Sequence, residues 1–186
     1  MKKETRVIGI DDGPFIKGSK KDVLVVGAIF RGGTLFDGLL STKVKIDGEN
    51  STTKLVKMIN ESKFKPQLQC VFLDGIAVAG FNVIDVQKLN DETGLPIVVI
   101  IRRFPDYGKI KRALNIIKKI SKFKLMEKAG PIHKIEKIYC QLIGINEKKA
   151  RELLKITCTR SDIPEAIRVS HMIASGIVDG ESRGRA

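Results

Sequence analysis

Residues 5–13 read TRVIGIDDG, an apolar run that ends in two acids and a glycine. A short apolar run of this kind predicts a buried strand, and the Asp-Asp-Gly-Pro that follows is turn chemistry. Two more strands are predicted, over 23–30 before Arg31-Gly32-Gly33, and over 35–46 before Asp47-Gly48. Because the connections are short and contain glycine, the three strands are expected to form an antiparallel meander.

The pattern after residue 50 alternates between helix and strand. The run at 96–101 is apolar and rich in β-branched residues, which is typical of a central strand covered on both faces. A meander followed by such alternation predicts an α/β fold with a mixed sheet. We expect one domain over 1–186, with 179–186 as a flexible tail. The remaining strands are predicted over 68–73 and 135–143, and helices over 51–61, 81–92, 105–120, 146–154 and from Pro164 onward.

Composition narrows the class of protein. The 186 residues are 42% hydrophobic, with apolar runs throughout, which excludes intrinsic disorder. No apolar run approaches the ~20 residues of a membrane-spanning helix, and the basic start lacks a signal-peptide core, so we expect a cytoplasmic protein. Cys70, Cys140 and Cys158 form no CxxC pair, which favours free thiols over a disulfide or a zinc site.

The charge is strongly positive. Lys and Arg number 34 against 21 acids, a formal net charge of +13, with lysines gathered at 17–21, 109–128 and 134–137. A basic surface favours a polyanionic partner, because neutralising phosphates releases counterions. The sequence therefore predicts DNA or RNA as partner; the alternative is that the lysines only confer solubility.

Acidic residues follow two of the predicted strands. Asp11 and Asp12 close the first strand, and Asp74 closes the strand at 68–73. If these strands are parallel neighbours, their carboxyl ends lie about 4.8 Å apart, in the crevice where open α/β sheets bind ligands. Two carboxylates so close repel each other unless a cation such as Mg²⁺ or Mn²⁺ lies between them. The alternative is that Asp-Gly after a strand is an ordinary turn.

Several motifs resemble known families. Over nearly its whole length the chain resembles an archaeal family of uncharacterised proteins, domain of unknown function ninety-nine. It is more distantly similar to endonuclease V of the ribonuclease H-like superfamily, at Gly9-Ile10-Asp11, 72–75, 94–102 and 163–168. The first resemblance rests on IGIDDGPF (8–15), KIDG (45–48), GFNVIDV (80–86), TGLPIVVIIRR (93–103) and IPEAIRVSHMIASGIVDGESRGRA (163–186).

The resemblance implies a five-stranded sheet in the order 3-2-1-4-5, flanked by helices, with a C-terminal strand and helices added. It implies a metal-dependent nuclease or phosphodiesterase acting on DNA or RNA. Asp11 and Asp74 would hold Mg²⁺ or Mn²⁺, with Asp47 or Glu49 as a third carboxylate and Asp12 as a further ligand. The nucleic acid would be contacted by Arg102, Arg103, Arg168 and Arg183.

The chain also departs from endonuclease V. The Gly-His that endonuclease V carries near its late strand is Gly144-Ile145 here, and no Tyr-Pro wedge stands at 35–40. Inosine-specific cleavage is therefore not implied. His171, on the last predicted helix, is a candidate for proton transfer, or else a packing residue. The alternatives to a nuclease are a non-catalytic nucleic-acid-binding protein on the same fold and an enzyme of small phosphorylated metabolites.

Overall fold

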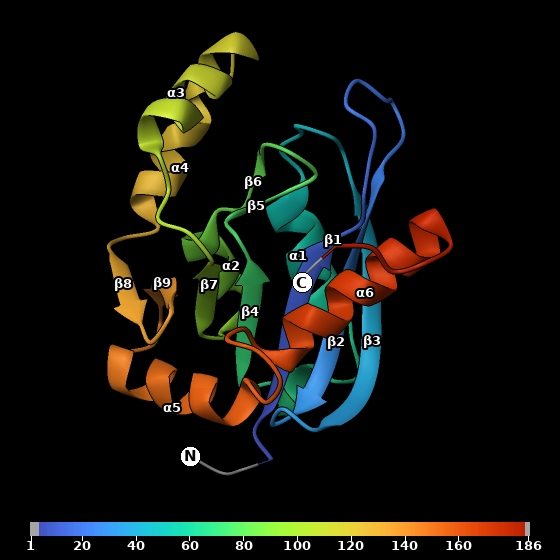
Figure 1. Ribbon diagram of the computed structural model, residues 1–186, viewed down its shortest axis with the longest axis vertical. Coiled ribbons are helices and arrows are strands. Elements are labelled where there is room, and N and C mark those ends of the chain that lie inside the picture. The colour runs from blue at the N-terminus through green and yellow to red at the C-terminus, as the bar shows by residue number, and fades with distance from the viewer. Residues whose placement is uncertain (1–3, 185–186) are drawn as a thin grey trace.

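The computed structural model describes residues 4–184 and shows one large sheet with helices packed on both faces (Figure 1). None of the helices within those residues is long and apolar enough to cross a membrane. The strands are β1 (Arg6–Asp12), β2 (Val23–Arg31), β3 (Leu35–Val44), β4 (Cys70–Asp74), β5 (Ala77–Val78), β6 (Asn82–Val83), β7 (Ile97–Ile101), β8 (Ile132–Ile135) and β9 (Ile138–Ile143). The helices are α1 (Ser51–Asn60), α2 (Val86–Thr93), α3 (Tyr107–Ile116), α4 (Phe123–Lys128), α5 (Glu147–Thr157) and α6 (Glu165–Asp179), with 3₁₀ turns η1 (Lys65–Gln67) and η2 (Ile120–Lys122).

The sheet has the order β3-β2-β1-β4-β7-β9-β8. β1 pairs antiparallel with β2 and parallel with β4, and β7 is parallel to β4. The predicted α/β class with a mixed sheet is confirmed, and the first five positions reproduce the implied order 3-2-1-4-5. The β8–β9 hairpin extends this sheet along β7, with β9 antiparallel to β7.

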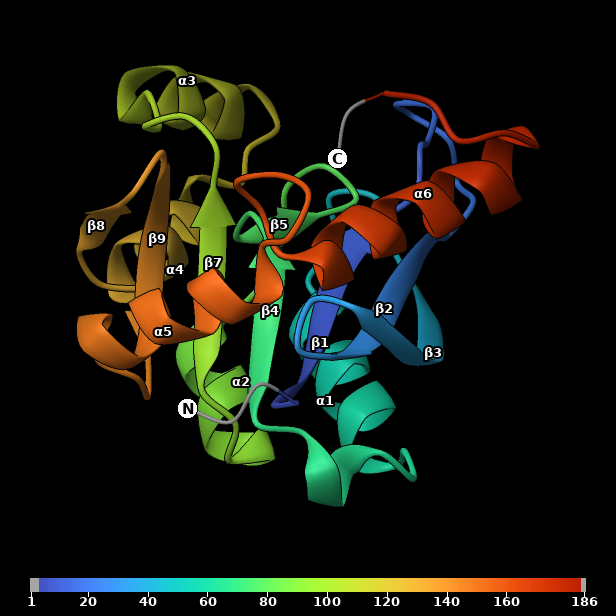
Figure 2. The ribbon, with the colours of Figure 1, turned by 60° about the horizontal axis from the view of Figure 1, so that its bottom comes forward.

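Alternation along the strands divides the core into two layers. Ile8 and Ile10 of β1 pack with α1 and α2 on one face, whereas Val7 packs with α5 and α6 on the other. Figure 2 shows α5 and α6 crossing the same face of the sheet. The purely apolar run at 96–101 is β7, buried on both sides as predicted.

Three predicted elements differ from the structure. The strand expected over 135–143 is the β8–β9 hairpin, because Glu136 has φ 52° and turns the chain. The helix expected over 81–92 begins only at Val86, since Asp85 caps it by accepting from the backbone N–H of Lys88 and residues 77–83 form the β5–β6 hairpin. The helix expected over 105–120 ends at Ile116, because Lys118 has φ 55° and the chain turns there into η2.

Gly9 determines how closely α6 approaches the sheet. A Cβ at Gly9 would lie 2.3 Å from the carbonyl carbon of Ala166 and 2.4 Å from the backbone nitrogen of Ile167. These are backbone atoms of the first turn of α6, so a side chain at Gly9 would force the helix away from β1. The contact fixes the position of every residue that α6 presents to the end of β1.

We expect Gly9→Ala to lower the free energy of unfolding by about 3 kcal/mol. The added methyl group would clash with backbone atoms of α6, and these cannot rotate out of the way as a flexible side chain could. Gly176→Ala is the matched control on α6, where a Cβ would meet nothing closer than 3.6 Å. That control should be neutral or slightly stabilising, because alanine favours a helix interior. Urea unfolding of the three proteins checks this, and equal losses in both variants would contradict it.

Candidate metal and nucleic-acid site

The carboxyl ends of β1 and β4 bring two acids together. In the parallel pairing Ile10 is opposite Leu73, so Asp11 and Asp74 are the next residues of their strands and share a face of the sheet. Asp11 is only 6% exposed. Burial and the charge of Asp11 raise the pKa of Asp74 to about 6, although Arg102 opposes the shift. The pair is thus a desolvated, mutually repelling set of oxygen donors, which is the environment a hard divalent cation relieves.

Arg102 and His171 complete the surroundings of this pair. The Nη2 of Arg102 lies 2.5 Å from Oδ2 of Asp74. The Nδ1 of His171, on α6, lies 2.8 Å from Oδ2 of Asp11, and its Nε2 lies 3.2 Å from the carbonyl oxygen of Arg183. The hydrogen bond to Asp11 raises the pKa of His171 despite partial burial. An imidazole therefore reaches the site from α6, although none stands at Gly144-Ile145.

The other candidate carboxylates are engaged in other contacts. Asp12 and Asp47 both hold the β5–β6 turn: Oδ2 of Asp12 accepts from the backbone N–H of Ala79 at 2.9 Å, and Oδ1 of Asp47 accepts from that of Phe81 at 2.7 Å. Glu49 is exposed and pairs with Lys119 at 3.7 Å. Within residues 4–184 no three Asp, Glu, His or Cys side chains are arranged to hold a metal. The structure therefore supplies two carboxylates and does not bring the implied third one to them.

Lys122 holds the backbone around Asp47, and sequence reasoning missed it. This lysine is only 4% exposed and donates from Nζ to the carbonyl oxygens of Asp47, Gly48 and Phe81, at 2.8, 2.5 and 2.6 Å. It ties the segment after β3 to the β5–β6 hairpin. Nothing marks Lys122 within the lysine-rich stretch 109–128, because the carbonyls it binds come from distant parts of the chain.

The remaining arginines are placed differently from one another. Arg168 is paired with buried Glu165 at 2.7 Å, in the first turn of α6. Arg103 is exposed after β7. Arg183 pairs with Glu181 at 2.5 Å, and its backbone reaches His171. Of the four nucleic-acid candidates, Arg102 contacts the acidic pair directly and Arg183 reaches the site through its backbone.

The described part of the predicted tail folds back along α6. Ser182 Oγ donates to the carbonyl oxygen of Met172 at 3.0 Å, and the backbone N–H of Arg183 donates to Ser175 Oγ at 3.1 Å. Residues 185–186 of that tail lie outside the described residues. Cys70, Cys140 and Cys158 form no disulfide with one another, and Cys70 and Cys140 are buried.

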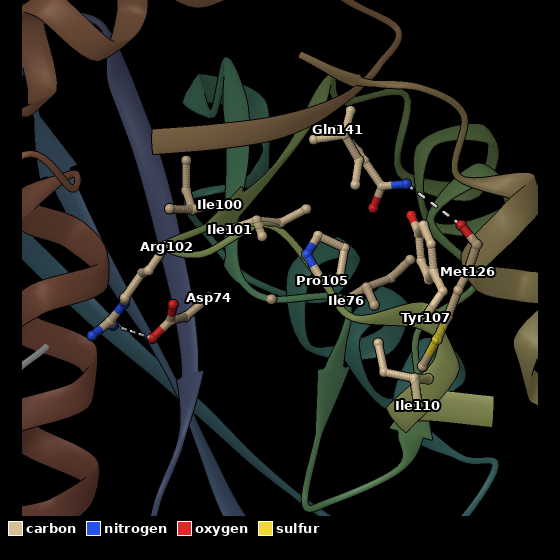
Figure 3. Close-up of a pocket in the computed structure, with 12 residues that line it drawn as sticks. Asp74, Ile76, Ile100, Ile101, Arg102, Pro105, Tyr107, Ile110, Met126 and Gln141 are labelled. Atoms are coloured by element: carbon tan, nitrogen blue, oxygen red, sulfur yellow. Dashed lines mark hydrogen bonds and ion pairs between the residues drawn. The ribbon is translucent and has the colours of Figure 1, made fainter. Parts of the chain in front are cut away.

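A cavity of about 320 Å³ adjoins the acidic pair (Figure 3). Asp74 and Arg102 stand at one side of it, and Tyr107 and Gln141 stand at the other. Most of the wall between them is apolar and includes Ile76, Pro105, Ile110 and Met126.

We expect the metal-free protein to lose stability as pH rises from about 4 to about 7. Burial, and then the charge of Asp11, raise the pKa of Asp12 from 3.8 to about 7, so between these values the folded state holds a proton that the unfolded state has released. Asp74 acts in the same direction up to about pH 6. His171 adds to the trend, because its charged pair with Asp11 is lost as pH rises through its raised pKa. Urea unfolding at several pH values measures the slope. Asp12→Asn should flatten it, and a slope that Asp12→Asn leaves unchanged would contradict the assignment.

Comparison with solved structures places the fold. Endonuclease V of Ciona intestinalis, solved with a 24-mer DNA that contains an inosine followed by a ribo-adenosine, superposes with a TM-score of 0.61 at 14% identity, over 95% of this chain and 86% of that one. Endonuclease V of Bacillus subtilis superposes with a TM-score of 0.60 at 8% identity, over 95% and 81%. The sheet order and these neighbours define an α/β protein with the endonuclease V fold.

The family follows from the sequence comparison. The model of the endonuclease dU family matches residues 3–178, and the chain belongs to that family. A UPF0215 protein of Methanothermobacter thermautotrophicus is 44% identical over 191 residues, which span 100% of this chain and 94% of the relative. A crystal structure from Archaeoglobus fulgidus has a TM-score of 0.86 at 39% identity, over 92% of this chain and 97% of that one.

Proposed function

We propose that this protein is a metal-dependent endonuclease that cuts DNA at a deaminated base. The observation that carries the proposal is the Asp11–Asp74 pair at adjacent strand ends, with His171 hydrogen-bonded to Asp11. The family name, endonuclease dU, and the inosine-containing DNA bound by the Ciona neighbour support a deaminated nucleotide as substrate.

The donor set suits Mg²⁺ or Mn²⁺. These ions take oxygen ligands, and Mg²⁺ commonly binds one or two carboxylates while water and substrate phosphate complete its shell. Asp11 and Asp74 would hold the ion, which when bound would activate a water and polarise the scissile phosphate. Arg102 lies where it can neutralise a phosphate oxygen, and it also balances Asp74 before substrate arrives. His171 orients Asp11 through Nδ1 and carries its transferable proton at Nε2.

Basic projections flank this site and suit a nucleic acid. The loop between β1 and β2 and the helix α3 both extend beyond the carboxyl ends of the central strands, on either side of the acidic pair (Figure 1). Their lysines and arginine are exposed: Lys17, Lys20 and Lys21 on the loop, and Lys109, Lys111 and Arg112 on α3. A duplex lying across the site would meet positive charge at both ends of its contact.

A nuclease screen tests the proposal. The full chain is incubated with Mn²⁺ or Mg²⁺ and with single-stranded, duplex, branched, uracil-containing and hypoxanthine-containing DNA and RNA. We expect metal-dependent cutting near the deaminated base of DNA and none with EDTA. DNA binding without cutting on any substrate would overturn the nuclease and leave a non-catalytic nucleic-acid-binding protein.

The affinity for DNA should fall steeply with salt. On duplex DNA each neutralised phosphate contributes about −0.9 to the slope of log K against log salt, so several engaged lysines give a steep line. Fluorescence anisotropy between low and physiological salt measures this slope. Charge reversal of Lys20 and Lys109, one on each projection, should make it shallower. A flat salt dependence in the wild type would show that the lysines serve solubility.

A further inference from the structure

Gln141 has a buried side-chain amide whose nitrogen is hydrogen-bonded and whose oxygen, within the described residues, is not. It lies on β9, is 3% exposed, and donates from Nε2 to the carbonyl oxygens of Gly130 at 2.9 Å and Met126 at 3.4 Å. Both partners can only accept, so the nitrogen must lie on their side and the amide cannot be flipped. The oxygen Oε1 turns toward the cavity beside Asp74 (Figure 3), and no group within residues 4–184 donates a hydrogen bond to it.

Tyr107 brings a second polar group to the same cavity. Its ring packs edge-on against Phe123, with 5.5 Å between ring centroids, which holds the phenol against the cavity wall. A phenol is protonated at neutral pH, so the Tyr107 hydroxyl can donate a hydrogen bond; burial and then Glu127 raise its pKa further. The cavity therefore presents a fixed acceptor and a donor between apolar walls.

Size and position indicate what this cavity holds. At about 320 Å³ it lies at the lower end of ligand-pocket volumes, about 300–1,000 Å³, and so suits a single planar base. Asp74 and Arg102 stand at its side, so a base inside it would leave its own phosphate next to the acidic pair. Enzymes that act on one base of DNA commonly turn that base out of the helix into such a pocket.

We propose that the cavity receives a turned-out base with a lactam edge, and that Gln141 is the specificity-determining residue. Gln141 Oε1 accepts from the ring N–H, while the Tyr107 hydroxyl donates to the neighbouring carbonyl. Cytosine and adenine present a ring nitrogen acceptor beside an amino group, whereas deamination to uracil or hypoxanthine turns this into a ring N–H beside a carbonyl. A locked acceptor repels the first arrangement and binds the second. This inference rests on the proposed function and adds how a deaminated base is distinguished from the cytosine or adenine that it derives from.

A binding measurement tests it without requiring turnover. Two duplexes are compared that differ only in carrying uracil or cytosine opposite an abasic site, so that pairing strength does not contribute. The quantity is the ratio of the two Kd values, measured by anisotropy in EDTA. The wild type should favour uracil by about tenfold or more, the loss expected when a buried polar group meets the wrong edge.

Gln141→Met should bring this ratio close to one, and Tyr107→Phe should lower it in part while keeping the ring against Phe123. Tyr139→Phe is the matched control, because Tyr139 packs edge-on against Phe104 and does not line the cavity; it should keep the wild-type ratio. Thermal melting verifies that each variant is folded. If Gln141→Met does not fold, the ratio measured for Tyr107→Phe provides the test.

Equal affinity of the wild type for both duplexes, or an unchanged ratio in folded Gln141→Met or in Tyr107→Phe, would overturn the inference. The nuclease itself is judged separately. If the protein cuts DNA but shows no base preference, the role of Gln141 is refuted and the nuclease proposal stands. If it shows base preference in binding but cuts no substrate, the nuclease proposal is refuted and the role of Gln141 stands.

Discussion

Asp11→Asn is expected to lower metal-dependent DNA cleavage by about 10³-fold, roughly 4 kcal/mol, because the cation loses a buried anionic ligand. The fold should survive, since asparagine keeps the Oδ1 that accepts from the backbone N–H of Asp12 at 2.8 Å. DNA affinity in EDTA should be unchanged or tighter, because one negative charge facing the phosphates is removed. Single-turnover cleavage and anisotropy on the same preparation measure both quantities.

Asp12→Asn is the matched control for that experiment. Asp12 is the next residue of the same strand, but it points to the other face and holds the β5–β6 turn through Ala79. Its asparagine variant keeps an acceptor for that bond and should retain most of the cleavage. Equal losses in the two variants would mean that both acids act in catalysis or that neither acts specifically. Full activity of Asp11→Asn would refute the proposed site.

Asp74→Asn is expected to weaken Mn²⁺ binding at least about tenfold, because affinity of such sites follows the number of charged ligands. The loss has a second cause. Arg102, which pairs with Asp74 at 2.5 Å, would face the incoming cation with its charge no longer balanced. Isothermal titration calorimetry of Mn²⁺ into metal-free wild type and variant measures the change.

Asp47→Asn separates this site from the carboxylate that the family resemblance implied. Asp47 is engaged with the backbone N–H of Phe81, so its variant should bind Mn²⁺ like the wild type. Weakening by Asp47→Asn and none by Asp74→Asn would place the metal away from the β1–β4 edge. Indistinguishable binding in all three proteins would remove the metal site altogether.

Local chemistry made much of the fold predictable. Apolar runs that end in Asp-Gly mark where β1 and β4 stop, and the side chain of Asn146 caps α5 by accepting from the backbone N–H of Lys149, as its position suggested. The hairpins were harder to predict. The turns at Glu136 and Ala79 place non-glycine residues at φ 52° and 49°, a conformation that residue type does not reveal.

The only part of the candidate site that could be predicted is the acidic pair, because the register of β1 against β4 alone places its two residues side by side. Asp11 and Asp74 end adjacent parallel strands, so their pairing follows from the sheet order alone. The cavity depends on a third element, because Gln141 reaches it from β9, whose antiparallel position beside β7 no local pattern specifies.

The sequence by itself determined strands β1 to β4 and β7, the acids that end β1 and β4, and the basic charge, because each depends on neighbours within a few residues. Tertiary structure decided which groups meet those acids. His171 lies 160 residues from Asp11 along the chain and reaches it because α6 packs backbone to backbone against Gly9. Lys122 joins two distant segments by donating to three of their carbonyl oxygens. Such contacts are set by packing between elements, and packing is a property of the whole chain.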